Sequence, residues 1–198
     1  MPRARYHHGD LRNALVDGGV ELGRHGGVGA VVLTQLARSV GVSPAAAYRH
    51  FPGGHDELLD AVAERARVEL AERMRDGIRT SAAAQPGPVH AAMLRFGATG
   101  RAYVDFALEQ PGLFELACLR DHDLAHEGGV AALLNACLDE LVELGRLPAA
   151  RRPRTEVAAW AAVHGLAVLL TTGPLAGLDP VEREAVIGRT LEVVGSGI

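Results

Sequence analysis

The chain has 198 residues, of which 48% are hydrophobic, and a formal net charge of −4, which suits one large or two small globular domains with a real core. No apolar stretch is long enough to cross a membrane, and the N-terminus, with its arginines and histidines, lacks the apolar segment of a secretory signal peptide. Residues 1–56 carry six arginines and four acidic residues, whereas the rest carries fourteen and twenty, so any nucleic-acid contact is expected in the first part.

The first helix is predicted from Asp10 to Arg24, after a basic arm of residues 1–8. Apolar residues recur in it at spacings of four and three, which is the pattern of one buried helix face. Gly18 and Gly19 lie in the middle, where each glycine costs about 1 kcal/mol relative to alanine. We therefore expect another helix to pack closely against these two glycines.

Residues Leu33 to Phe51 predict two short helices joined by a tight turn. Gly41 follows the apolar face of the first helix, where left-handed backbone costs glycine least. Ser43 is expected to cap the second helix, and Pro44 fits its first position. With Ala47 and Phe51 turned inward, the outward residues are Ala45, Ala46, Tyr48, Arg49 and His50.

The outward side chains of this second helix suit a DNA groove. Methyl groups can meet thymine methyls, and the polar tips can reach phosphates or base edges. An ordinary helical hairpin with a polar outer face is the alternative interpretation of the same spacing.

A long helix is predicted from Asp56 to about Thr80. Its roughly 25 residues would span about 37 Å, too much for the N-terminal unit to cover, so we expect it to join a second helical body. The remaining predicted helices are Val89–Gln110, a short piece at Gly112–Cys118, Val130–Leu144, Thr155–Thr172 and Pro180–Val194. No stretch has the period of a strand. The sequence therefore predicts an all-α protein of about nine helices, with domains at 1–55 and 56–198.

The N-terminal third resembles the TetR family of bacterial transcriptional repressors. The resemblance rests on the capped helix pair with Gly41-Val42-Ser43, on the tetrad Tyr48-Arg49-His50-Phe51, and on the helix start Asp56-Glu57-Leu58-Leu59. The rest is similar to a subgroup whose regulatory domain carries a Trp-His-Gly helix, here Trp160, His164 and Gly165. The opening Tyr6–Arg12 and the helix break at Phe106–Phe114 fit that subgroup.

This resemblance implies a homodimer that binds double-stranded DNA at a palindromic operator, with one recognition helix per major groove. It implies release by a small-molecule effector. The two cysteines, Cys118 and Cys137, are few and far apart, which suits a reduced cytoplasm. The sequence has no catalytic motif, so we expect no cofactor and no enzymatic activity. The DNA-binding residues expected from the resemblance are Thr34, Ser43, Pro44, Ala45, Ala46, Tyr48, Arg49, His50 and His55.

Roles for these residues follow from matching positions. Tyr48 and His50 would hold phosphates, Ala45 and Ala46 would face bases, and Arg49 could read a guanine or hold a phosphate. Val32 stands where the family usually has a capping Ser or Thr, so we expect Thr34 to cap instead. The turn Pro52-Gly53-Gly54-His55 lacks the family's phosphate-binding lysine, which leaves His55 or the free N–H groups of the helix start.

The effector site is expected among Phe96, Tyr103, Phe106, Phe114, Cys118, Trp160 and His164. Trp160 and His164 stand one turn apart, so they could line a cavity. They could instead pack in a four-helix bundle that the last two long helices form in the dimer. Tyr103, Phe106, Phe114 and Cys118 surround the helix break that is expected to border the cavity, although such residues more often belong to the core.

Two further patterns have ordinary explanations. His122 and His126 have the spacing of a metal-ligand pair, but the acids and glycines around them favour a solvated loop, so we expect no metal site. Cys118 and Cys137 could form a redox pair, although inert thiols are commoner.

Two alternative functions remain for the whole protein. An all-α enzyme with an N-terminal docking module would need a group of acid–base residues that the sequence does not show. A repressor without an effector is the other alternative.

Overall fold

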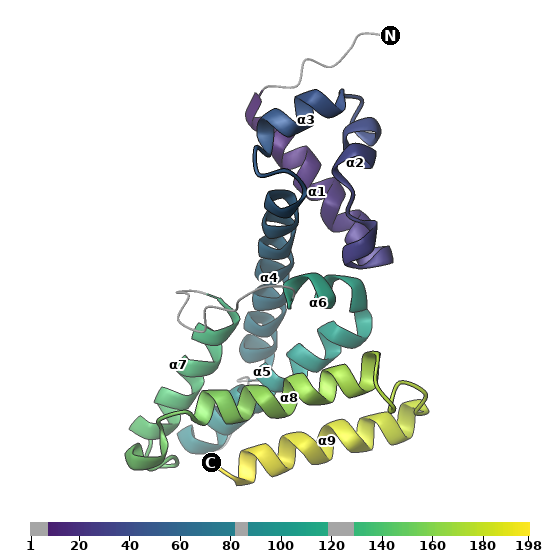
Figure 1. Ribbon diagram of the computed structural model, residues 1–198. Coiled ribbons are helices and arrows are strands. Elements are labelled where there is room, and N and C mark those ends of the chain that lie inside the picture. The colour runs from purple at the N-terminus through teal and green to yellow at the C-terminus, as the bar shows by residue number, and fades with distance from the viewer. Residues whose placement is uncertain (1–7, 82–86, 119–128) are drawn as a thin grey trace. The chain divides into compact units, whose positions relative to one another are not determined.

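The computed structural model describes residues 8–81, 87–118 and 129–198, and in these the chain forms nine α-helices, two short 3-10 helices and no strand (Figure 1). The α-helices are α1 (His8–Gly26), α2 (Leu33–Ser39), α3 (Pro44–His50), α4 (Gly54–Ser81), α5 (Pro88–Glu109), α6 (Pro111–Ala117), α7 (Val130–Glu143), α8 (Thr155–Thr171) and α9 (Pro180–Ser196). The 3-10 helices are Val28–Ala30 and Ala149–Arg151. The predicted all-α class is confirmed, with most helix ends within two residues of the expected ones.

Internal contacts divide the chain into two compact units. The first takes residues up to Arg67 and the segment that begins at Gln110, so it holds α1, α2, α3, the first part of α4, and α6. The second holds the rest of α4 with α5, α7, α8 and α9. The 28-residue α4, about 42 Å long, thus contributes to both units, as its length predicts. A functional boundary after residue 55 stays a prediction.

The first unit is built around the contact of α1 with α2 and α4. Its fully buried side chains include Leu15, Leu33, Leu36, Phe51 and Leu58. A Cβ on Gly18 would lie 3.0 Å from Leu36 Cδ2, and one on Gly19 would lie 2.6 Å from Val62 Cγ2. The close approach expected at these mid-helix glycines is therefore confirmed.

The backbone of α6 touches the C-terminal end of α1 in the same unit. A Cβ on Gly112 would lie within 3.0 Å of Gly23 O, and 3.0 Å from Gly27 N, so only glycine fits there. Glu115 on α6 accepts a hydrogen bond of 3.2 Å from the backbone N–H of Val28. The sequence predicted only a short helical piece here, and nothing local indicates that it packs on α1.

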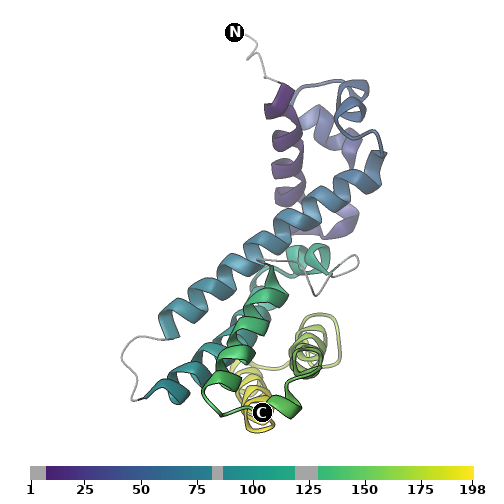
Figure 2. The same ribbon diagram turned by 90° about the vertical axis from the view of Figure 1, so that its left-hand side faces the viewer.

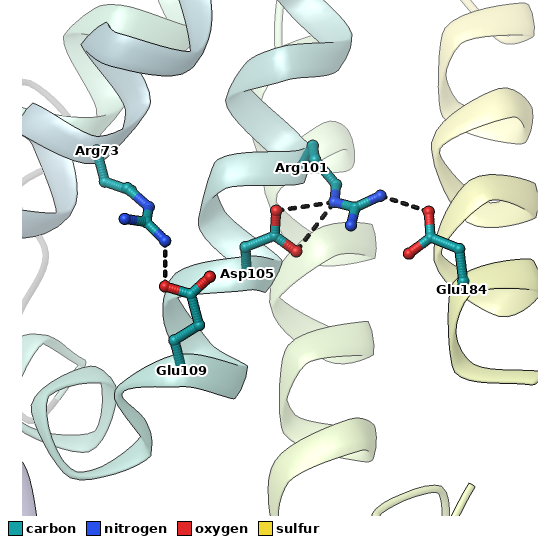
Figure 3. Close-up of polar contacts among 5 residues, drawn as sticks. All are labelled: Arg73, Arg101, Asp105, Glu109 and Glu184. Atoms are coloured by element: carbon teal, nitrogen blue, oxygen red, sulfur yellow. Dashed lines mark hydrogen bonds and ion pairs between the residues drawn. The ribbon is translucent and has the colours of Figure 1, made fainter. Parts of the chain in front are cut away.

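In the second unit, α5 packs against α7, α8 and α9 (Figure 1, Figure 2). One buried cluster contains Ala92, Phe96, Cys137, Leu138, Leu141, Leu147, Ala159 and Ile198. Ion pairs also join helices of this unit (Figure 3). Arg101 on α5 contacts Asp105 of its own helix and Glu184 on α9. Arg73 on α4 pairs with Glu109 on α5. The hydrogen bonds to Asp105, then to Glu184, raise the pKa of Arg101. None of the helices in the described residues is long and apolar enough to span a membrane.

Candidate nucleic-acid interface and regulatory site

The turn between α2 and α3 is fixed by a left-handed glycine. Gly41 has φ +76°, a conformation that costs other residues energy. Its N–H donates to Arg38 O at 3.1 Å, and the N–H of Val42 donates to Ala37 O at 2.9 Å. These two bonds satisfy the last carbonyls of α2 in the Schellman arrangement. The chain therefore leaves α2 in one direction, and α3 begins at Pro44, three residues after Gly41.

The start of α3 is capped as the sequence predicts. Ser43 Oγ accepts a hydrogen bond of 3.2 Å from the backbone N–H of Ala46, and Pro44 occupies the first helical position. Ala47 and Phe51 are completely buried, which fixes the inner face of the helix. The outer face is thereby also fixed.

That outer face presents the expected side chains. Tyr48 is 46% exposed, and Arg49 is exposed beside it. Ser43, Pro44 and Ala45 are exposed as well, whereas Ala46 and His50 are half-buried. A phenol, a guanidinium and an imidazole thus follow one another along a helix end whose first turn carries only small groups.

Thr34 does not cap α2, so that prediction is wrong. The cap residue is Val32, in extended conformation and without a side-chain hydrogen bond to the helix. Its carbonyl already accepts from the N–H groups of Gln35 and Leu36, both at 3.0 Å. The helix therefore begins at Leu33, and Thr34 lies inside the first turn, half-buried.

The turn into α4 uses its own backbone donors. The N–H of Gly53 donates to Glu57 Oε2 at 2.9 Å, and the N–H of Gly54 donates to Phe51 O at 2.8 Å. His55 is exposed on the first turn of α4. Of the phosphate-binding groups expected here, the His55 side chain is thus better placed than the N–H groups of the two glycines.

Arg12 on α1 also reaches this region, which sequence reasoning missed. Its guanidinium carbon lies 4.8 Å from the centroid of the Phe51 ring, and one of its nitrogens lies 3.4 Å from Glu57 Oε1. No short-range signal could have found this contact, because 45 residues separate Arg12 from Glu57.

Three of the predicted effector residues meet between α5 and α8. The hydroxyl of Tyr103, a side chain only 3% exposed, shares a hydrogen bond of 2.9 Å with His164 Nδ1. The rings of Trp160 and His164 are stacked, with centroids 5.0 Å apart. A polar pair with an aromatic wall thus lies between α5 and α8 in the second unit.

The other four predicted effector residues lie on α5, on α6 or directly after α6. Phe96 belongs to the buried cluster with Cys137, and Phe106 is buried on α5. Phe114 and Cys118 belong to the first unit. The seven residues therefore do not form one cluster within either unit, and their assignment stays a prediction.

Neither cysteine forms a disulfide. Cys118 lies in the first unit and Cys137 in the second. Burial, and then the nearby Glu140, raises the pKa of Cys137 to about 11, which suppresses its reactive thiolate. His122 and His126 lie outside the described residues, and the described ones contain no group of three or more side chains that could hold a metal ion.

Comparison with known proteins decides the family. The model of the bacterial regulatory proteins of the tetR family matches residues 15–62, and a tetracyclin repressor-like C-terminal domain matches residues 96–194, half of the chain. The chain belongs to the TetR family. It is thus a helix-turn-helix transcriptional regulator from a family without enzymatic activity, which removes the enzyme alternative.

Individual relatives agree with this. The uncharacterized HTH-type transcriptional regulator YobS of Bacillus subtilis strain 168 is 32% identical over 115 residues, which cover 58% of this chain and 55% of that protein. A protein with unknown function from Rhodococcus sp. RHA1 has a TM-score of 0.71 at 28% identity, over 99% of both chains. The crystal structure of SCO4313 has a TM-score of 0.60 at 20% identity, over 98% of both chains, and shows the fold alone.

Proposed function

We propose that this TetR-family regulator is a cytoplasmic repressor that binds a palindromic operator as a homodimer and is released by a small molecule. The observation that carries the proposal is α3 itself. Ala47 on its inner face and Phe51 directly after its end are fully buried, whereas Tyr48 and Arg49 are exposed on a helix capped by Ser43. We also assign the second unit to the subgroup with a Trp-His-Gly helix, on the sequence of α8.

The proposed contacts divide by chemistry. Tyr48, His50 and His55 hold phosphates, which gives affinity without sequence preference. Ala45 and Ala46 face base edges, where their methyl groups suit thymine. Arg49 contacts either a guanine or a phosphate. Ser43 and Pro44 at the start of α3, and Thr34 in the first turn of α2, approach the sugar-phosphate backbone of the DNA.

The proposed dimer uses α8 and α9, because large apolar side chains on both helices are exposed in one chain. They are Val157, Val168 and Leu169 on α8, and Val181 and Val193 on α9. Exposed apolar patches of this kind usually mark a protein interface. Two copies would then present their α3 helices to half-sites roughly 34–36 Å apart.

The proposed effector acts on the Tyr103–His164 pair. A ligand with its own donor or acceptor can replace the hydrogen bond between these side chains, while Trp160 supplies an aromatic wall. The long α4 contributes to both units, so it would carry the change to α3. An effector releases DNA only if it binds the two arrangements with different affinity.

The DNA proposal is tested by selecting bound duplexes from a random pool with the purified protein. We expect a palindromic consensus, and binding that strengthens at low salt. The double variant Tyr48→Ala plus His50→Ala should lose it. The matched control is His25→Ala plus His90→Ala, which removes two exposed histidines far from α3 in sequence. Unchanged binding by the first double variant would refute the assignment of these residues.

The dimer and effector proposals have separate tests. Sedimentation should give a dimer, and Val168→Glu plus Leu169→Glu should give a monomer, whereas Val89→Glu, at an exposed valine in the first turn of α5, should not. A compound screen by thermal shift should find ligands whose binding weakens with Tyr103→Phe. If every ligand that stabilises the protein leaves DNA binding unchanged, the effector-free alternative is favoured.

A further inference from the structure

Arg12 is a permanent cation held beside the end of α3. Its guanidinium carbon lies 4.8 Å from the centroid of the Phe51 ring, within the range of a cation–π contact. Phe51 directly follows the last residue of α3 and is fully buried, so the ring is a fixed platform. The Arg12 side chain is nevertheless 44% exposed. One face of the group is anchored by the ring, and nearly half of the side chain stays accessible to solvent.

The ionic partner of Arg12 holds it only weakly. Glu57 Oε1 lies 3.4 Å from Arg12 Nη2, and the Glu57 side chain is 35% exposed. An ion pair this long and this exposed contributes little to stability, because water screens it. The second carboxylate oxygen of Glu57 already accepts the N–H of Gly53. Arg12 can therefore turn a donor to another anion at small cost, while Glu57 stays in place.

The charges near the end of α3 show why a cation is useful at this edge of the interface. The first turn of α4 carries Asp56 and Glu57, so the edge of the interface next to α3 has two carboxylates. The turn before it, Pro52 to Gly54, has no cationic side chain, and both of its glycine N–H groups are bonded within the chain. Arg49 in the last turn of α3 is the other permanent cation near these two carboxylates, so Arg12 adds to the positive charge that an approaching phosphate meets.

We propose that Arg12 contacts a DNA phosphate next to the end of α3, and that Glu57 and the Phe51 ring hold it ready for that contact. This inference rests on the proposed DNA binding. Guanidinium suits a phosphate because its fork of donors can bind two oxygens at once. The contact adds affinity for any sequence, since phosphates carry no base information.

The test measures how binding to a short random-sequence duplex depends on salt. Each phosphate contact contributes about 0.9 to the slope of log K against log salt concentration. Arg12→Gln should lower the magnitude of the slope by about that amount and weaken binding equally on random and selected duplexes. Arg12→Lys should restore most of the slope, because lysine keeps the charge.

The matched control is Arg65→Gln. Arg65 on α4 also pairs with an acid of the other helix, Asp17 on α1, at 3.0 Å, and is similarly exposed at 48%. It should keep the full slope. Glu57→Gln, which keeps an acceptor for the Gly53 N–H, should strengthen binding at low salt.

Two results would overturn the inference in different ways. An unchanged slope in Arg12→Gln, with the wild-type protein binding well, would show that Arg12 only pins α1 to α3 and α4. A wild-type protein that ignores every duplex would instead refute the proposed function itself, and this inference with it.

Discussion

Replacing Gly112 with alanine would place a methyl group where α6 touches the backbone of α1. The added Cβ would lie within 3.0 Å of Gly23 O, and 3.0 Å from Arg24 O and Gly27 N. All three are backbone atoms, so no side-chain rotation can relieve the clash. The helix α6 would have to move by roughly 1.5 Å to restore ordinary contact distances of about 3.5–4.0 Å.

The cost follows from what that movement disturbs. Overpacking of this kind costs about 1–3 kcal/mol, and stretching the hydrogen bond from Val28 N–H to Glu115 adds about 1 kcal/mol. Leu116 on the same helix is completely buried and would be loosened as well. Alanine returns at most about 1 kcal/mol through helix propensity. We therefore expect a net loss of about 1–3 kcal/mol in the free energy of unfolding.

Urea unfolding followed by circular dichroism measures this loss as a lower midpoint. The control is Gly97→Ala within α5, where the added Cβ would have no atom within 4 Å apart from the neighbouring backbone of its own helix. That variant should be more stable by about 0.5–1 kcal/mol, because glycine is the poorer helix residue. A Gly112→Ala protein as stable as wild type, or stabilised like the control, would refute the backbone contact between α6 and α1.

Three more substitutions have defined outcomes. Ser43→Ala should lower the free energy of unfolding by about 1 kcal/mol through loss of the α3 cap, and Ser43→Asn should not, as urea midpoints would reveal. Tyr103→Phe should cost about 1–2 kcal/mol, and a double-mutant cycle with His164→Leu should give coupling near 1 kcal/mol; additive effects would mean that the two side chains do not bond. Because burial raises the pKa of Cys137 from 9.0 to about 11, the folded protein holds that proton more tightly than the unfolded chain. The contribution of this protonated thiol to the stability of the folded protein is complete below pH 9 and is lost as the pH rises toward 11. The thermal midpoint of the Cys137→Ala protein should therefore fall less steeply between these two pH values.

The sequence by itself determined the features that depend on neighbouring residues. Gly41, Ser43 and Pro44 define the turn and the start of α3 within four residues, and the structure has the expected φ and the expected cap. Periodicity likewise predicted the helices and the inward direction of Ala47 and Phe51. These predictions succeeded because hydrogen bonds of caps and turns join groups a few residues apart. The cap at Thr34 failed although it is local, since the Val32 carbonyl had already started the helix.

Only the tertiary structure decided which distant residues meet. The Tyr103–His164 hydrogen bond joins residues 61 apart in sequence, and the Glu115–Val28 bond joins residues 87 apart. The packing of whole helices decides which side chain of α5 faces α8 and which glycine of α6 faces α1. The identity of a single residue does not predict that packing. For the same reason, the sequence shows Arg12 only as one more polar residue of α1. Its contact with the ring of Phe51, which makes it a candidate for DNA binding, exists only in the folded protein.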